Sequence, residues 1–133
     1  MKDAPITVLI VEDEPPLANI IKIRFEQSGF GVYTARTATE ALDILKKVSN
    51  IDVIWLDHYL VGSTGLELVE QVKQDPAFAS IPIYLVTNTA GDEAIYNYLH
   101  LGVVKYFVKT NIKLTDAINQ IVNQLNFPET VNS

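Results

Sequence analysis

The chain contains no cysteine among its 133 residues, which excludes disulfides and thiolate metal sites and is consistent with a reducing compartment. Basic residues are also few: 10 lysine and arginine side chains stand against 16 aspartate and glutamate side chains, and the formal net charge is −6. Because binding to nucleic-acid phosphates needs a basic surface, we expect no direct nucleic-acid binding by this chain.

Long hydrophobic runs are missing as well, and no apolar stretch reaches the roughly 20 residues that cross a bilayer. The first five residues lead straight into a strand-like run without the apolar core of a signal peptide. We therefore expect a cytoplasmic protein with no membrane segment. The hydrophobic content of 48% is enough for one buried core but the length is too short for two ordinary domains, so we predict one domain over residues 4–125 and a short C-terminal tail over 126–133.

The chain does contain five short strand-like runs. Four of them are continuously hydrophobic, as strands buried on both faces are, and they cover residues 8–11, 53–56, 83–86 and 106–108. The fifth run, residues 31–35, includes Gly31 and Thr34 and has the mixed character of an edge strand.

Five stretches between and after these runs have apolar residues at the spacing of helices. The first is expected to start at Pro15 and to end at Gly29. Its predicted buried stripe consists of Leu17, Ile20, Ile21 and Phe25. The second has Thr39 as its expected N-cap. The remaining three helices are predicted before the break at 75–76, over 92–101 with a stop at Gly102, and along the stripe from 114 to 125.

Alternation of strands and helices predicts an α/β fold, a doubly wound five-stranded parallel sheet with helices on both faces, because parallel neighbours need right-handed crossovers. Polar residues follow the strands at their carboxyl ends: Glu12 and Asp13 after the first, Asp57 after the third, Thr87 after the fourth and Lys109 after the fifth. In open parallel sheets ligands bind outside these ends. We therefore expect an acidic pocket with one fixed positive charge, that of Lys109.

Three neighbouring carboxylates repel one another unless a cation lies between them. Ligands that are all oxygen favour a hard ion, Mg²⁺ before Ca²⁺. With Lys109 and Thr87 available to phosphoryl oxygens, Asp57 is the natural nucleophile for phosphoryl transfer.

Taken singly, each of these residues also has a local explanation. Glu12 and Asp13 could serve only to favour the start of the first helix, and Asp57 could be a turn former. Independent roles of this kind do not require all of the residues to meet at one sheet edge, so their joint order favours the shared site.

The chain resembles the receiver domain of two-component response regulators and is similar to the bacterial chemotaxis receiver. The resemblance extends from about Ile6 to Leu125. The residues that carry it are Leu9 to Pro15 (LIVEDEP), Leu56-Asp57 with Gly65 downstream, Val86-Thr87, Gly102, and Tyr106 to Lys109 (YFVK). It implies the flavodoxin-like receiver fold with strand order 2-1-3-4-5.

The resemblance also implies roles for the site residues. Asp57 would accept a phosphoryl group from a sensor histidine kinase or a phosphotransfer protein. Asp13, Asp57 and the backbone carbonyl of Tyr59 would bind Mg²⁺ directly, Glu12 would act through water, and Lys109 would contact the phosphoryl group.

Thr87 and Tyr106 would form the switch, which alters the surface made by the fourth helix, fifth strand and fifth helix. Such a domain promotes only its own phosphorylation and dephosphorylation and is not otherwise an enzyme. It would act on a downstream effector.

Three positions depart from the pattern of this family. Val61 and Thr110 stand where proline is common, and Asn88 is larger than the residue usual after the threonine. We predict a trans Lys109–Thr110 peptide bond, because a cis bond before a residue other than proline costs about 3 kcal/mol.

Three other functions share parts of this pattern. A flavin-mononucleotide electron carrier shares the strand order, but Glu12 to Glu14 would repel the cofactor phosphate, and the purified protein would be coloured. A phosphohydrolase with an aspartyl nucleophile would turn over phosphate esters. A receiver-like interaction module that takes no phosphate would fail to bind Mg²⁺. The chain is either a stand-alone receiver or a fragment of a larger regulator.

Overall fold

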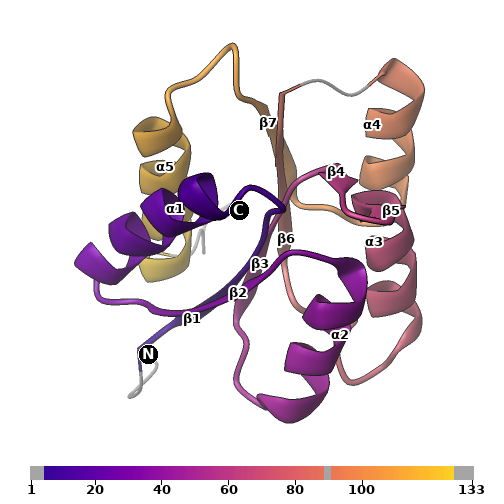
Figure 1. The fold of residues 1–133 in the computed structure, drawn as a ribbon, viewed down its shortest axis with the longest axis horizontal. Coiled ribbons are helices and arrows are strands. Elements are labelled where there is room, and N and C mark those ends of the chain that lie inside the picture. Colours follow the sequence, from indigo (N-terminus) through magenta and orange to yellow (C-terminus); the bar gives the residue numbers. More distant parts are fainter. Residues whose placement is uncertain (1–4, 89–90, 128–133) are drawn as a thin grey trace.

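The computed structural model of the protein describes residues 5–88 and 91–127. Five strands form its central sheet: β1 (Thr7–Val11), β2 (Gly31–Ala35), β3 (Val53–Leu56), β6 (Ile83–Thr87) and β7 (Lys105–Val108). Every pairing in this sheet is parallel. The spatial order is β2-β1-β3-β6-β7 (Figure 1), so the predicted order of the five strands is confirmed, with β2 at an edge.

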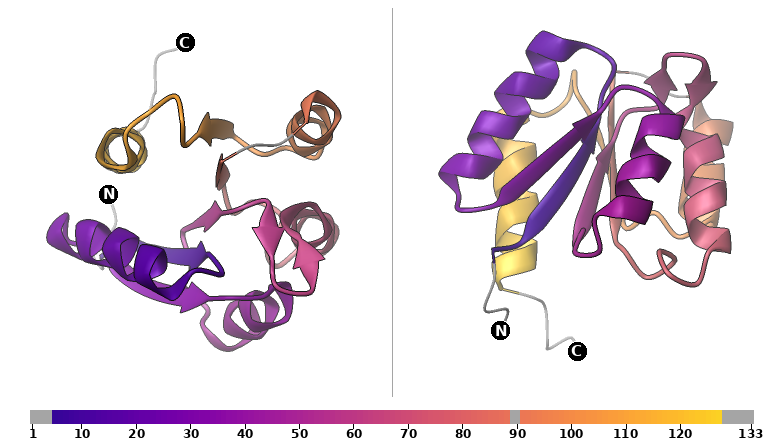
Figure 2. Two further views of the ribbon diagram at one scale, coloured as in Figure 1. Left: turned by 45° about the horizontal axis from the view of Figure 1, so that its top comes forward. Right: turned by 60° about the horizontal axis from the view of Figure 1, so that its bottom comes forward.

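Helices cover both faces of the sheet, as predicted. One face carries α1 (Pro15–Gln27) and α5 (Leu114–Asn126), and the other carries α2 (Ala38–Lys47), α3 (Gly65–Gln74) and α4 (Asp92–His100) (Figures 1 and 2). Successive side chains of a strand point to opposite faces. Val8 and Ile10 of β1 accordingly pack in the core beneath α1 and α5, and Leu9 and Val11 pack in the core on the opposite face.

Two helical details differ from the sequence predictions. Ile20 of α1 is half exposed, because the helix is rotated so that Ala18 joins Ile21 and Phe25 against the sheet. The N-cap of α2 is Thr37 and not Thr39, since the Thr37 hydroxyl accepts a hydrogen bond of 3.0 Å from the Glu40 N–H. The helix thus begins two residues earlier than a cap at Thr39 implies.

A small hairpin after β3 was not predicted. It consists of β4 (Tyr59–Leu60) and β5 (Ser63–Thr64), which pair antiparallel. Gly62 turns the chain between them with a φ of 79°, a conformation that side chains other than glycine rarely adopt. Strands of two residues are too short to show any periodicity. The hairpin places the residues after β3 close to the start of α3.

The predicted helix stops are confirmed at Gly29 and Gly102, which follow α1 and α4 with φ values of 88° and 100°. The last helix, α5, extends to Asn126, and most of the predicted tail lies outside the described residues. None of the helices in the described part of the chain combines the length and apolarity needed to cross a membrane.

Candidate functional site

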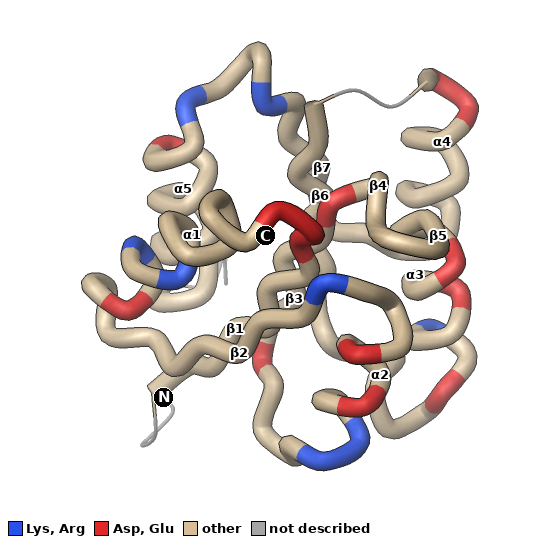
Figure 3. The backbone as a smooth tube through the Cα atoms, in the orientation of Figure 1, with Lys and Arg blue, Asp and Glu red and all other residues tan. Residues whose placement is uncertain are grey.

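The three predicted acids meet at the carboxyl edge of the sheet. Val11 and Leu56 are register partners at the ends of β1 and β3, so the residues that follow each strand emerge side by side. The Asp57 N–H donates to the Val11 carbonyl at 3.1 Å, which fixes this arrangement. One carboxylate oxygen from each of Glu12, Asp13 and Asp57 lies within 4.8 Å of the others. The acidic segments after β1 and β3 lie together in Figure 3.

Lys109 brings a positive charge to this cluster from the far side of β6. Its backbone N–H donates to the Thr87 carbonyl at 2.8 Å, so the chain continues along β6 after β7 has ended. Its ammonium nitrogen lies 3.3 Å from Glu12 Oε1 and 3.3 Å from Asp57 Oδ2. The lysine side chain is 14% exposed and therefore largely shielded from water. One ammonium is thus shared by two carboxylates.

Glu12 is the most deeply buried acid of the cluster, with no exposed surface. Burial, and secondly the charge of Asp57, raise its pKa from 4.5 to about 7. Lys109 and a hydrogen bond of 3.3 Å from the Glu14 N–H act in the opposite direction. The positive charge of Lys109 therefore does not compensate fully for desolvation and repulsion.

The remaining predicted site residues lie around the cluster. Thr87 ends β6 and is completely buried, whereas Tyr106 on β7 is 39% exposed. The Tyr59 side chain is exposed and its N–H approaches Asp57 Oδ1 at 3.4 Å. The roles assigned to these residues stay predictions.

Two of the departures from the family pattern lie at this edge. Asn88 and Thr110 are both exposed, directly after the buried Thr87 and the shielded Lys109. No peptide bond among the described residues is cis, so the predicted trans bond between Lys109 and Thr110 is confirmed.

A second group of residues beside Asp57 was not identified from the sequence. The His58 Nδ1 atom lies 2.6 Å from the hydroxyl of Tyr98, a fully buried residue of α4. Burial lowers the pKa of His58, against the opposing charge of Asp57. The contact joins residues 40 positions apart, so no local pattern indicates it.

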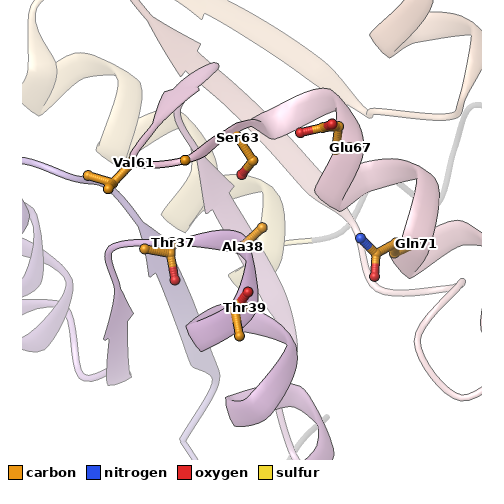
Figure 4. A pocket seen from close by; sticks show the side chains of 8 residues that line it. Thr37, Ala38, Thr39, Val61, Ser63, Glu67 and Gln71 are labelled. Carbon is orange, nitrogen blue, oxygen red and sulfur yellow. The ribbon is translucent and has the colours of Figure 1, made fainter.

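A separate pocket of about 330 Å³ lies between the starts of α2 and α3 (Figure 4). Residues from α2, the hairpin and α3 line it: Thr37, Ala38, Thr39, Val61, Gly62, Ser63, Glu67 and Gln71. None of the three clustered acids is among them. The pocket is therefore not part of the acidic site.

Comparison with known proteins identifies the family. The model of the response regulator receiver domain matches residues 8–122, most of the chain. The chain belongs to the response regulator receiver domain family. Receiver domains are the signalling switches of two-component systems, so the functional class that the resemblance implied is confirmed.

Relatives of this receiver domain include regulators of different lengths. The phosphate regulon transcriptional regulatory protein PhoB of Pseudomonas aeruginosa is 30% identical over 77% of this chain and 44% of PhoB. A chemotaxis protein CheY homologue of Campylobacter jejuni is 32% identical over 77% of this chain and 79% of that protein. The receiver domain thus aligns with less than half of PhoB and with most of the CheY homologue.

Among solved structures, the phosphorylated cyanobacterial phytochrome response regulator RcpA resembles this receiver domain with a TM-score of 0.78. The two are 25% identical, and the match covers 92% of each chain.

Proposed function

We propose that this receiver domain is a phosphorylation switch in which Asp57 accepts a phosphoryl group from the phosphohistidine of a histidine kinase or phosphotransfer protein. The observation that carries the proposal is the Lys109 ammonium, 3.3 Å from both Asp57 and Glu12 at the sheet edge where Asp13 also lies. The similarity to RcpA, which was solved in its phosphorylated form, supports it.

The donor set fits a hard divalent cation such as Mg²⁺, because the clustered groups are all carboxylates and lie within 4.8 Å of one another. Asp13, Asp57 and the Tyr59 carbonyl would hold the ion directly, and Glu12 would act through water. The bound ion would neutralise negative charge on the phosphoryl oxygens.

In the proposed reaction a carboxylate oxygen of Asp57 attacks phosphorus, the phosphorus–nitrogen bond of the donor breaks, and the leaving imidazole takes up a proton. The product is an acyl phosphate at Asp57. Lys109 already faces Asp57, so its ammonium can pair with the negative oxygens of the transferred group.

The phosphoryl oxygens at Asp57 would trigger the conformational change of the switch. The Thr87 hydroxyl would move toward them, and Tyr106 would change rotamer with it. Because Tyr106 belongs to β7, this rearrangement alters the surface formed by α4, β7 and α5, where a downstream effector would bind.

Intact-mass measurement after incubation with acetyl phosphate tests this function. We expect one phosphoryl group per chain in the presence of Mg²⁺, stable to acid and labile to base, and no adduct in Asp57→Asn. Asp43→Asn, which removes an exposed carboxylate of α2, is the matched control and should be modified like the wild type. An adduct that persists in Asp57→Asn, or that forms equally well in excess chelator, refutes the proposed function.

A further inference from the structure

Three segments that are distant in the sequence meet directly behind Asp57. They are the loop residue His58, the start of α3 at Gly65, and Tyr98 of α4. Tyr98 has no exposed surface, and its ring meets the His58 ring edge to face, with centroids 5.5 Å apart and planes at 80°. A tyrosine hydroxyl this deep in the core needs hydrogen-bond partners.

The hydroxyl of Tyr98 has two such partners. Its oxygen accepts a hydrogen bond from the Leu66 N–H, one of the amides at the start of α3 that have no acceptor within the helix. The other partner is His58 Nδ1, 2.6 Å away, and the tautomer of His58 decides which of the two atoms donates. Tyr98 thereby links α4 to both α3 and the loop after Asp57.

Space at this junction is so limited that only glycine fits at the start of α3. A Cβ atom on Gly65 would lie 2.6 Å from the Asp57 carbonyl oxygen and 2.8 Å from the Tyr98 hydroxyl. The Gly65 N–H donates to the His58 carbonyl at 2.7 Å. The backbone after Asp57 is thus held in two ways: α3 binds the His58 carbonyl, and α4 contacts the His58 ring.

We propose that Tyr98, acting through His58, is a positioning residue that fixes the backbone from Asp57 to Tyr59 relative to α4. The consequence for Mg²⁺ rests on the proposed function, in which this backbone supplies the Tyr59 carbonyl as a ligand. Displacement of α4 then weakens ion binding, and by linkage an occupied site restrains α4. This connection does not pass through Thr87 or Tyr106.

Calorimetric titration of the full chain with Mg²⁺ tests the proposal. Tyr98→Phe keeps the buried ring and removes only the hydroxyl, and we expect it to weaken Mg²⁺ binding about tenfold, as loss of a group that orients a metal ligand does. Tyr96→Phe is the matched control on the same helix, because Tyr96 is 66% exposed and stacks on His100. It should bind Mg²⁺ like the wild type.

His58→Ala removes the partner of the Tyr98 hydroxyl and keeps Tyr98 itself, and it decides the question if Tyr98→Phe does not fold. We expect a similar loss of affinity in His58→Ala, and no further loss when both substitutions are combined, because both remove the same link. Wild-type affinity in the single variants, or additive losses in the double variant, overturns the proposal.

If the wild type itself binds no Mg²⁺, the proposed function fails, and amide hydrogen exchange of the metal-free protein decides the positioning role. The amides of Tyr59 and Gly65 should then exchange faster in Tyr98→Phe than in Tyr96→Phe. Equal exchange in the two variants overturns the positioning role.

Discussion

Glu12 is a carboxylate with no exposed surface that shares the ammonium of Lys109 with Asp57. Its pKa rises from 4.5 to about 7, mainly because burial penalises the charged form and secondly because Asp57 repels it. Between these two pH values the folded protein therefore holds a proton that the unfolded chain has released. The stability of the metal-free protein must then fall as the pH rises.

We predict this pH dependence for the protein in chelator. The contribution of Glu12 is complete below pH 4.5 and is lost as the pH rises through about 7. Between these limits the free energy of unfolding should fall by up to about 1.4 kcal/mol per pH unit for one proton. Urea unfolding of wild type and Glu12→Gln between pH 5 and 8 measures the effect. Glu12→Gln should lack this loss of stability with rising pH. Identical pH profiles of the two proteins would contradict a raised pKa of Glu12.

The sequence was sufficient to predict which charged residues would meet, because Glu12, Asp13, Asp57 and Lys109 each follow an apolar strand and parallel strands end at one edge. It was not sufficient for Tyr98, because the contact with His58 depends on how α4 is rotated against α3. Periodicity places a helical residue on a face, but it does not specify which loop that face meets.

At the scale of elements, α2 shows how moving the cap by two residues changes where the helix starts. Thr37 caps the Glu40 N–H at 3.0 Å, and the Glu40 carboxylate accepts from the Arg36 N–H at 2.8 Å. Thr39, the predicted cap, is an exposed residue within the helix. Threonine is a preferred N-cap residue, so both positions suit a cap. Only the burial of Ala38, which places it on the apolar face of the helix, distinguishes them.

We predict that Thr37→Ala lowers the free energy of unfolding by about 1 kcal/mol, because it leaves an amide at the start of α2 without its acceptor. Thr39→Ala should change stability by less than about 0.5 kcal/mol, since alanine suits an exposed helical position at least as well as threonine. Thermal or urea unfolding of both variants provides the comparison. A larger loss in Thr39→Ala would show that the helix starts where the sequence alone suggested.

The other differences at this scale have similar causes. Ile20 satisfied the helical spacing of α1, but a helix buries only one stripe, and the sheet selects Ala18, Ile21 and Phe25. The apolar strands β1, β3 and β6 are buried on both faces, as predicted. The same prediction was wrong for β7, which lies at the edge of the sheet and leaves Lys105 and Tyr106 exposed. The hairpin of β4 and β5 was not predicted because its strands have only four residues in total, too few to show a hydrophobic periodicity.

For the whole molecule, the carboxyl edge of the sheet concentrates negative charge in a protein whose net charge is already −6. Glu12, Asp13 and Asp57 converge there, and Lys109 is the cation that contacts two of them. If the charge of Asp57 is removed, Lys109 stays paired with Glu12, and the repulsion that raises the Glu12 pKa is reduced. The arrangement that we propose for ion binding therefore opposes folding of the metal-free chain.

We predict that Asp57→Asn stabilises the metal-free protein by on the order of 1 kcal/mol, because the change is nearly isosteric and removes a repelling charge. Mg²⁺ should then stabilise the wild type more than the variant, since a ligand that binds the folded state adds stability as the logarithm of one plus the ratio of ligand concentration to Kd, which is larger for tighter binding. Urea unfolding of both proteins, in chelator and in Mg²⁺, gives the four midpoints needed. A variant less stable in chelator, with an Mg²⁺ increment equal to that of the wild type, would mean that the Lys109 ion pair outweighs the repulsion and that Asp57 contributes nothing to ion binding.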